Sequence, residues 1–516
     1  MAPTTRREFL DHVGRGMLVA GLGTTLSSDL GFSPAFAEDG SDRISFGPYD
    51  ELVDLLQSTP PDKLQPLLIG KLNRGEVDLK SLIAAGALSN AECFGGEDYV
   101  GFHTAMAMLP ALGMCDLLVT ERRPLPVLKV LYRNSTQIQA LGGASHKTLK
   151  TLHEHDHAPP ADVGIQIRDA CRQANVDKGE ALFATLENAS LEQQFDALQP
   201  GLQDDINVHR FVFAHRTHGL AQMLGKEYAH DILRQCVRFY VNHEQARIRN
   251  KSPESPIRTV LPQLLDQYKL AGRKFGTRDP GDAWVDATSR AIYQGPPAKS
   301  AEIVAAAIAD GIDREVIGEA ISLASNLLTL RQGPDRWRAH GDSAGVHAAD
   351  ATNAWRNIAR VTTPQHAIAG LIVAAYHSAA HAPFQSDPYP LADHRGMIKS
   401  TDPASLIAEA EDAVKQNDQG RASAAIQIYC EKGFAPEGVF DSMLKFTISE
   451  DGRLHGEKFY HTVREEYQTI RPAFRNRTLV ALARVTASAY GYDREDKHGF
   501  HAPGYEEACR LLGVPT

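Results

Sequence analysis

Apolar residues recur at intervals of three and four along most of the chain, the spacing that places them on one face of an α-helix. The stretch 301–330 is typical, because it is rich in Ala, Leu, Ile and Glu, residues that favour helices. We find no convincing run of alternating β-branched residues and no Asn-Gly hairpin signal. The pattern therefore predicts an all-α fold, a multi-helical array or bundle of about 18 to 24 helices of ordinary length.

Proline and glycine divide this helical pattern into segments, because a proline lacks the amide N–H that continues a helix. The predicted breaks lie at Pro60-Pro61, Pro159-Pro160, Asp279-Pro280, Gly295-Pro296-Pro297 and Gly333-Pro334.

Two histidine motifs recur at nearly the same offset along the chain. The motif Gly-apolar-His-x-Ala-x-Ala occurs at 101–107 and again at 345–351. An apolar-His-x-x-x-Phe-x-His motif occurs at 208–215 and again at 454–461. Two different motifs separated by about 245 residues indicate a tandem duplication, a repeat much longer than those of common helical solenoids. We predict two related helical halves, residues 38–280 and 281–516.

A finer repeat of four units is also visible, although it is weaker than the repeat of two halves. An apolar residue followed by histidine marks His103, His209, His347 and His455, and each is followed by a further apolar helical run. Single histidines align easily in a chain that holds 21 of them, so this pattern alone establishes less.

Composition and charge limit the function. The chain has 516 residues, of which 43% are apolar and 23% charged, an ordinary balance for a soluble globular protein. The formal net charge of -10 argues against nucleic acid as the main partner, because phosphate binding needs a basic surface. Six cysteines without a Cys-x-x-Cys pair exclude a disulfide scaffold, a thioredoxin motif and a zinc ribbon.

The first 37 residues carry an export pattern. Arg6-Arg7 is followed by Phe9-Leu10, by a short, weakly apolar, Gly-rich stretch, and by small residues at Ala35 and Ala37. This segment resembles a twin-arginine (Tat) signal peptide, which implies the Tat translocon as a partner and a periplasmic or secreted destination. The apolar stretch is too short for a stable membrane span. The alternative is a disordered cytoplasmic tail that happens to contain two arginines.

The histidines provide the main clue to chemistry. His377 and His381 are four residues apart, and His347 and Asp350 are three apart, so each pair lies on one face of a helix. Such pairs can bind one metal ion, and histidines from two duplicated halves can meet as they do in bundle-core metal centres. The predicted ligands are His347, His377, His381, Asp350, His103, His209, His215, His455 and His461.

Imidazole ligands suit iron, copper or zinc, so we expect a transition metal, iron or copper first and zinc as the alternative. The resemblance to a Tat signal adds to this expectation, since many Tat passengers acquire a metal or redox cofactor before export. We predict an exported, histidine-rich, metal-dependent enzyme, an oxidoreductase that acts on a small-molecule substrate. Two alternatives remain open: a non-catalytic periplasmic protein that binds metal or haem, and an α-helical interaction scaffold whose histidines are structural.

The densest histidine cluster is His153-Glu154-His155-Asp156-His157, just before Pro159-Pro160. Alternating histidines can bind a metal in a loop, but the same pattern is typical of a solvated polar loop, and the sequence does not decide between the two.

Overall fold

The computed structural model describes residues 44–151, 158–333, 343–381, 383–384, 386–491 and 502–516. Within these ranges the chain forms 23 α-helices, α2 to α24, a few short 3₁₀ turns and no β-strand. The only extended pairing there consists of two isolated bridges, from Gly276 to Asp313 and from Arg278 to Ile312. The prediction of an all-α multi-helical fold is confirmed. The export pattern of residues 1–37 and the cluster at 153–157 lie outside the described residues.

The helices before residue 281 are α2 (Asp50–Ser58), α3 (Pro61–Asn73), α4 (Leu79–Phe94), α5 (Tyr99–Cys115), α6 (Pro124–Ala140), α7 (Val163–Arg172), α8 (Val176–Ala184), α9 (Leu191–Leu202), α10 (Val208–Leu224), α11 (Lys226–Arg249) and α12 (Ile257–Gln267). The helices after it are α13 (Asp282–Gln294), α14 (Pro297–Ala309), α15 (Arg314–Arg331), α16 (Ala344–Val361), α17 (Pro364–Ala380), α18 (Ala392–Met397), α19 (Pro403–Lys415), α20 (Gln419–Glu431), α21 (Glu437–Thr447), α22 (Arg453–Thr469), α23 (Arg475–Ala489) and α24 (Tyr505–Leu512).

Polar side chains and prolines set where these helices begin. Asp98 caps α5 by accepting a hydrogen bond from the Gly101 amide at 2.7 Å, and Asn207 caps α10 by accepting one from the His209 amide at 2.9 Å. Ser343 caps α16 in the same way. Prolines occupy the first turn of α3, α6, α14 and α17, where a missing N–H costs no helical hydrogen bond.

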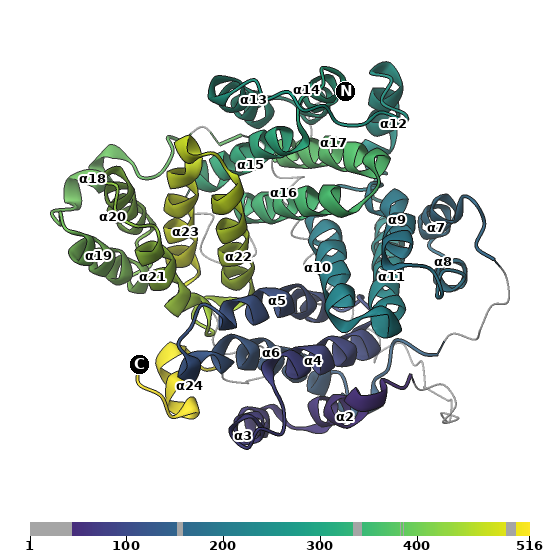
Figure 1. Ribbon diagram of the computed structural model, residues 1–516, viewed down its shortest axis with the longest axis horizontal. Helices are drawn as coiled ribbons and strands as arrows, with labels where there is room; N and C mark the ends of the chain where they lie inside the picture. Colours follow the sequence, from purple (N-terminus) through teal and green to yellow (C-terminus); the bar gives the residue numbers. More distant parts are fainter. Residues whose placement is uncertain (1–43, 152–157, 334–342, 382, 385, 492–501) are drawn as a thin grey trace.

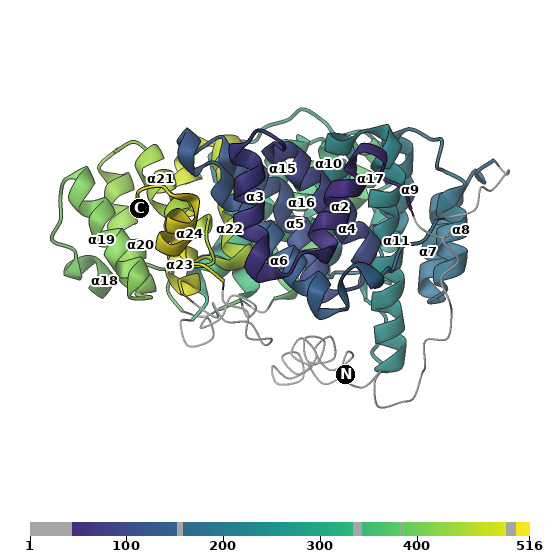
Figure 2. The ribbon, with the colours of Figure 1, turned by 90° about the horizontal axis from the view of Figure 1, so that it is seen from below.

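Four helices form the centre of the molecule and are called the frame here: α5, α10, α16 and α22. Figure 1 shows them as the four sides of a square, with α4 and α6 outside α5, α9 and α11 outside α10, α15 and α17 outside α16, and α23 outside α22. The remaining helices lie further out. Figure 2 shows α19 and α20 at one end of the molecule and α7 and α8 at the other. No helix in the described ranges is long and apolar enough to cross a lipid bilayer.

The apolar core does not stop between the two halves. One cluster of buried side chains extends from α2 through α17, and it includes Phe211 of α10 beside Trp355 of α16, with ring centroids 5.0 Å apart. A second cluster joins α19 to α23 and also takes in Met114 of α5 and Leu125 of α6. The frame therefore draws its stability from apolar packing on all four sides.

The glycines of the repeated motif have a packing role. A Cβ atom added to Gly101 of α5 meets the Phe94 ring of α4 at 2.5 Å, and one added to Gly345 of α16 meets the Thr329 Cα of α15 at 2.4 Å. Real Cβ atoms essentially never approach other heavy atoms so closely. At both places the absence of a side chain lets the preceding helix lie directly against a frame helix.

We expect Gly345→Ala to lower stability by about 1–3 kcal/mol, because the new methyl group meets backbone atoms that cannot rotate away. Gly101→Ala should also lower the stability. Gly113→Ala in α5 is the matched control, since nothing lies within 4 Å of its added Cβ. Alanine there should be neutral or slightly stabilising. Thermal or urea unfolding of the three variants checks this, and equal midpoints for Gly345→Ala and Gly113→Ala would contradict it.

Candidate metal centre

Each frame helix begins within a few residues of a buried or largely buried histidine. His103 is the fifth residue of α5, His209 the second of α10, His347 the fourth of α16 and His455 the third of α22. These are the histidines of the four-unit pattern in the sequence. Four separate helix starts therefore deliver one imidazole each to the centre of the frame.

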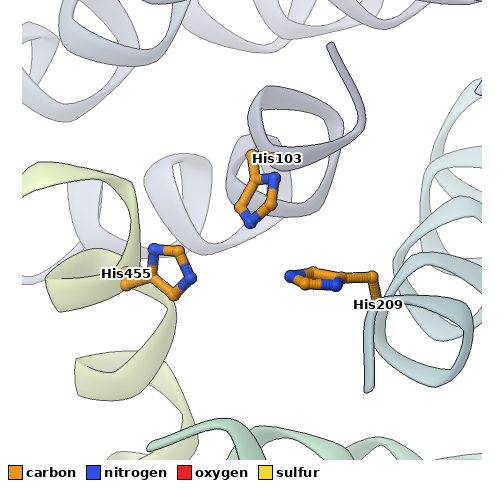
Figure 3. A group of neighbouring side chains, drawn as sticks. All are labelled: His103, His209 and His455. Carbon is orange, nitrogen blue, oxygen red and sulfur yellow. The ribbon is translucent and has the colours of Figure 1, made fainter. Parts of the chain in front are cut away.

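Three of these histidines form a compact group. One ring nitrogen from each of His103, His209 and His455 lies within 4.8 Å of the other two. Figure 3 shows the three rings pointing toward one another from three different helices. Two nitrogens bound to one ion at about 2.1 Å lie at most about 4.2 Å apart, so small ring rotations suffice to bind one ion.

His347 closes the group into a ring of four. Its ring centroid lies 5.5 Å from that of His209 and 5.3 Å from that of His455. The remaining neighbours are equally close, with 4.7 Å between His103 and His209 and 5.0 Å between His103 and His455. We call these four side chains the histidine ring.

The backbone orients at least one of these imidazoles for binding. His103 Nδ1 lies 2.7 Å from the Tyr99 carbonyl oxygen, which can only accept, so Nδ1 carries the proton and the lone pair is on Nε2. Hydrogen bonding of one ring nitrogen to a carbonyl is how metal-binding histidines are commonly fixed. The Nε2 atoms of His209 and His347 are buried and have no hydrogen-bond partner among the described residues.

The surroundings keep His209 and His347 neutral, the form of imidazole that binds metals. Burial lowers the pKa of His347 to about 3, and the nearby positive charge of Lys458 acts in the same direction. Burial also lowers the pKa of His209 well below its ordinary value, with His103, His347 and Lys458 adding to the effect. The partial positive charge at a helix start favours the neutral form too.

The other predicted ligands lie near the ring but outside the compact group. His377 and His381, at the end of α17, have ring centroids 5.4 Å apart. His381 contributes to the lowered pKa of His347, and His347 contributes to that of His377, so the pair lies beside the ring on its α17 side. Burial is the main reason that the pKa values of His377 and His381 are low.

The predicted ligands Asp350, His215 and His461 lie further along the frame helices. Asp350 Oδ1 accepts a hydrogen bond from Thr462 Oγ1 at 2.8 Å, across from α22. His461 Nε2 lies 3.1 Å from Glu465 Oε1 on its own helix, and His215 of α10 is coupled to both groups. These residues form a polar layer below the histidine ring.

Two buried cations at this level were not predicted from the sequence. Lys458 of α22 is 3% exposed and Arg216 of α10 is 5% exposed. Lys458 follows His455 by three residues, the same spacing by which Asp350 follows His347. This shared spacing is the sequence signal that could have identified Lys458, because a helical residue three positions after a ring histidine lies on the same face.

A buried lysine from the first half fixes the start of α22. Lys129 Nζ of α6 donates hydrogen bonds to the carbonyl oxygens of Thr447 at 2.7 Å and Arg453 at 2.6 Å, and it lies 3.4 Å from Glu457 Oε2. Both side chains of the ion pair are almost fully buried. Since His455 lies between Arg453 and Glu457, this contact holds one imidazole of the ring in place.

The arrangement can hold a metal ion with three or four neutral nitrogen ligands and leave further coordination positions for other molecules. No known protein family, curated protein or solved structure matches the chain. The chemistry of the site therefore rests on its own geometry.

We expect Lys129→Met to destabilise the protein by about 3–5 kcal/mol, because it leaves the buried Glu457 without its partner. The double variant Lys129→Met/Glu457→Gln should recover part of this loss, since it removes both charges. Lys71→Met is the control: the exposed Lys71–Glu76 pair should contribute at most about 1 kcal/mol. Urea unfolding of the four proteins measures these differences. A Lys129→Met variant as stable as Lys71→Met would contradict the expectation.

Proposed function

We propose that the protein is an exported metal-dependent enzyme, an oxidoreductase, whose metal ion is bound by His103, His209 and His455. The observation that supports it is the convergence of three ring nitrogens within 4.8 Å of one another, with His347 beside them. Each ligand comes from a different frame helix, so the site exists only when the whole frame is assembled.

The competing explanation is that each histidine is structural and bonded to its own backbone. For His103 that bond exists at Nδ1, and the ring itself points toward His209 and His455 (Figure 3). His209 and His347 have no hydrogen-bond partner for Nε2 among the residues that the structure describes. Burying a polar atom without a partner costs about 1–3 kcal/mol, and a bound metal ion removes that cost.

The choice of metal follows from the donors. Imidazole nitrogens without a bound thiolate or carboxylate suit iron, copper and zinc alike. Iron and copper support an oxidoreductase, and zinc is the alternative. The resemblance of residues 1–37 to a Tat signal adds support, because that route exports proteins already folded around their cofactors.

Metal analysis of protein purified without an affinity tag tests the proposal. We expect about one iron or copper ion per chain with visible absorbance, as one ion fits one group of three imidazoles. His209→Ala should lose the metal. His230→Ala is the matched control, because His230 is also buried but stacks on Phe183, at 4.8 Å between centroids, away from the ring.

Three outcomes separate the alternatives. Metal with turnover, measured as dioxygen uptake or oxidation of candidate substrates, supports the enzyme. Metal that is bound stoichiometrically without turnover supports a metal-binding protein. If neither the purified protein nor protein supplied with iron, copper or zinc retains an ion, the proposal is wrong and a scaffold is favoured.

The export proposal has its own test. Replacing Arg6 and Arg7 by lysine should keep the protein in the cytoplasm, because the arginine pair is the feature that the Tat pathway reads. Cell fractionation measures this, with Arg15→Lys as the control in the same segment. Equal export of both variants would count against a Tat signal.

A further inference from the structure

Below the histidine ring, two buried cations lie on the inner faces of the frame helices. Lys458 lies one turn after His455 on α22, and Arg216 lies two turns after His209 on α10. Spacings of three and seven residues place both on the helix faces that carry the ring histidines. Asp350 of α16 enters the same layer from the third side and is held there by Thr462.

Neither cation has the acceptors that buried cations normally have. Lys458 makes no hydrogen bond or ion pair with any residue in the described ranges, and Arg216 Nε has no partner there either. Two other buried cations of this protein are bonded: Lys129 contacts two carbonyl oxygens, and Arg484 donates to the carbonyl oxygens of Thr329 and Leu330 at 2.8 Å. An unbonded buried cation is costly unless an anion reaches it.

The carboxylates near the two cations are directed to other groups. Asp350 accepts a hydrogen bond from Thr462, and Glu457, the neighbour of Lys458, lies 3.4 Å from Lys129 Nζ. Glu465 acts electrostatically on Arg216, as Asp350 does, but its Oε1 lies 3.1 Å from His461 Nε2. Lys458 and Arg216 therefore have acidic neighbours but no ion-pair partner within the residues that the structure describes.

Electrostatic coupling also links these groups. Burial lowers the pKa of Lys458 to about 8, with Asp350 opposing the shift and Arg216 adding to it, so the two cations and the acid act on one another. Burial raises the pKa of Asp350 to about 6, against the effect of Lys458.

We propose that Lys458 and Arg216 bind the carboxylate group of a small anionic substrate, directly below the histidine ring. A planar carboxylate supplies the missing acceptors, because it can accept two parallel hydrogen bonds from a guanidinium and a third from an ammonium group. That this anion is a substrate of the metal centre rests on the proposed function. The anion site itself is built only from Lys458, Arg216 and Asp350.

Calorimetric titration of the full chain with formate and with acetate, in chloride-free buffer, tests this site. Lys458→Gln should weaken formate binding at least tenfold, and Arg216→Gln should have an effect of similar size. Asp350→Asn should tighten it severalfold, because it removes the opposing charge and keeps an oxygen that accepts from Thr462. Lys445→Gln on α21 removes an exposed cation of the same type and should change nothing.

The tightening in Asp350→Asn cannot come from misfolding, so it tests the site even if Lys458→Gln does not fold. The inference is overturned if wild-type protein does not bind formate, or if Asp350→Asn and Lys458→Gln bind it as the Lys445→Gln control does. Metal content is measured in the same samples. Metal without formate binding rejects only the anion site. Formate binding that depends on Lys458, in protein that retains no ion when supplied with iron, copper or zinc, rejects only the metal centre.

Discussion

Bringing four imidazoles together in the interior is the constraint on which the rest of this structure depends. A protonated histidine ring would repel its neighbours and would be poorly solvated, so the centre is stable only while the rings are neutral. Burial enforces that state at two of the rings, because it lowers the pKa of His347 to about 3 and that of His209 well below its ordinary value. The positive ends of the frame helices act in the same direction. The same neutral state leaves a lone pair on each ring.

The frame must be rigid for such a centre to persist, and contacts between distant parts of the chain provide that rigidity. Lys129 of α6 is bonded to the start of α22, more than 300 residues later in the sequence. Near the end of α22, Glu466 pairs with the buried Arg356 of α16. Close approach of α4 to α5 and of α15 to α16, through Gly101 and Gly345, keeps the outer helices against the frame.

The polar layer below the ring contains buried cations that lack ion-pair partners. By contrast, the buried Arg234 is bonded to Glu180 at 2.7 Å. In the layer, Lys458 and Arg216 have no ion-pair partner among the described residues, and the pKa of the neighbouring Asp350 is raised to about 6. Structural interiors normally pair their charges, so unpaired buried cations are a feature of sites that receive a ligand.

The sequence by itself determined the helical content and the places where many helices begin. Helix-favouring residues with a three-and-four spacing need no tertiary contact to be recognised, and proline breaks act locally. The breaks at Pro60-Pro61 and Gly295-Pro296-Pro297 became the starts of α3 and α14. The stretch 301–330 shows the limit of this reasoning, because Gly311 divides it with a φ of +74° between α14 and α15.

Which histidines meet was decided only by the tertiary structure. Local spacing on one helix drew attention to His377 and His381, whereas the compact group takes one histidine from each of three helices. The repeat of the apolar-His pattern did mark all four ring histidines. No local pattern gives the distance between rings on different helices, or shows that Lys458 lacks an acceptor, because both depend on how helices hundreds of residues apart pack together.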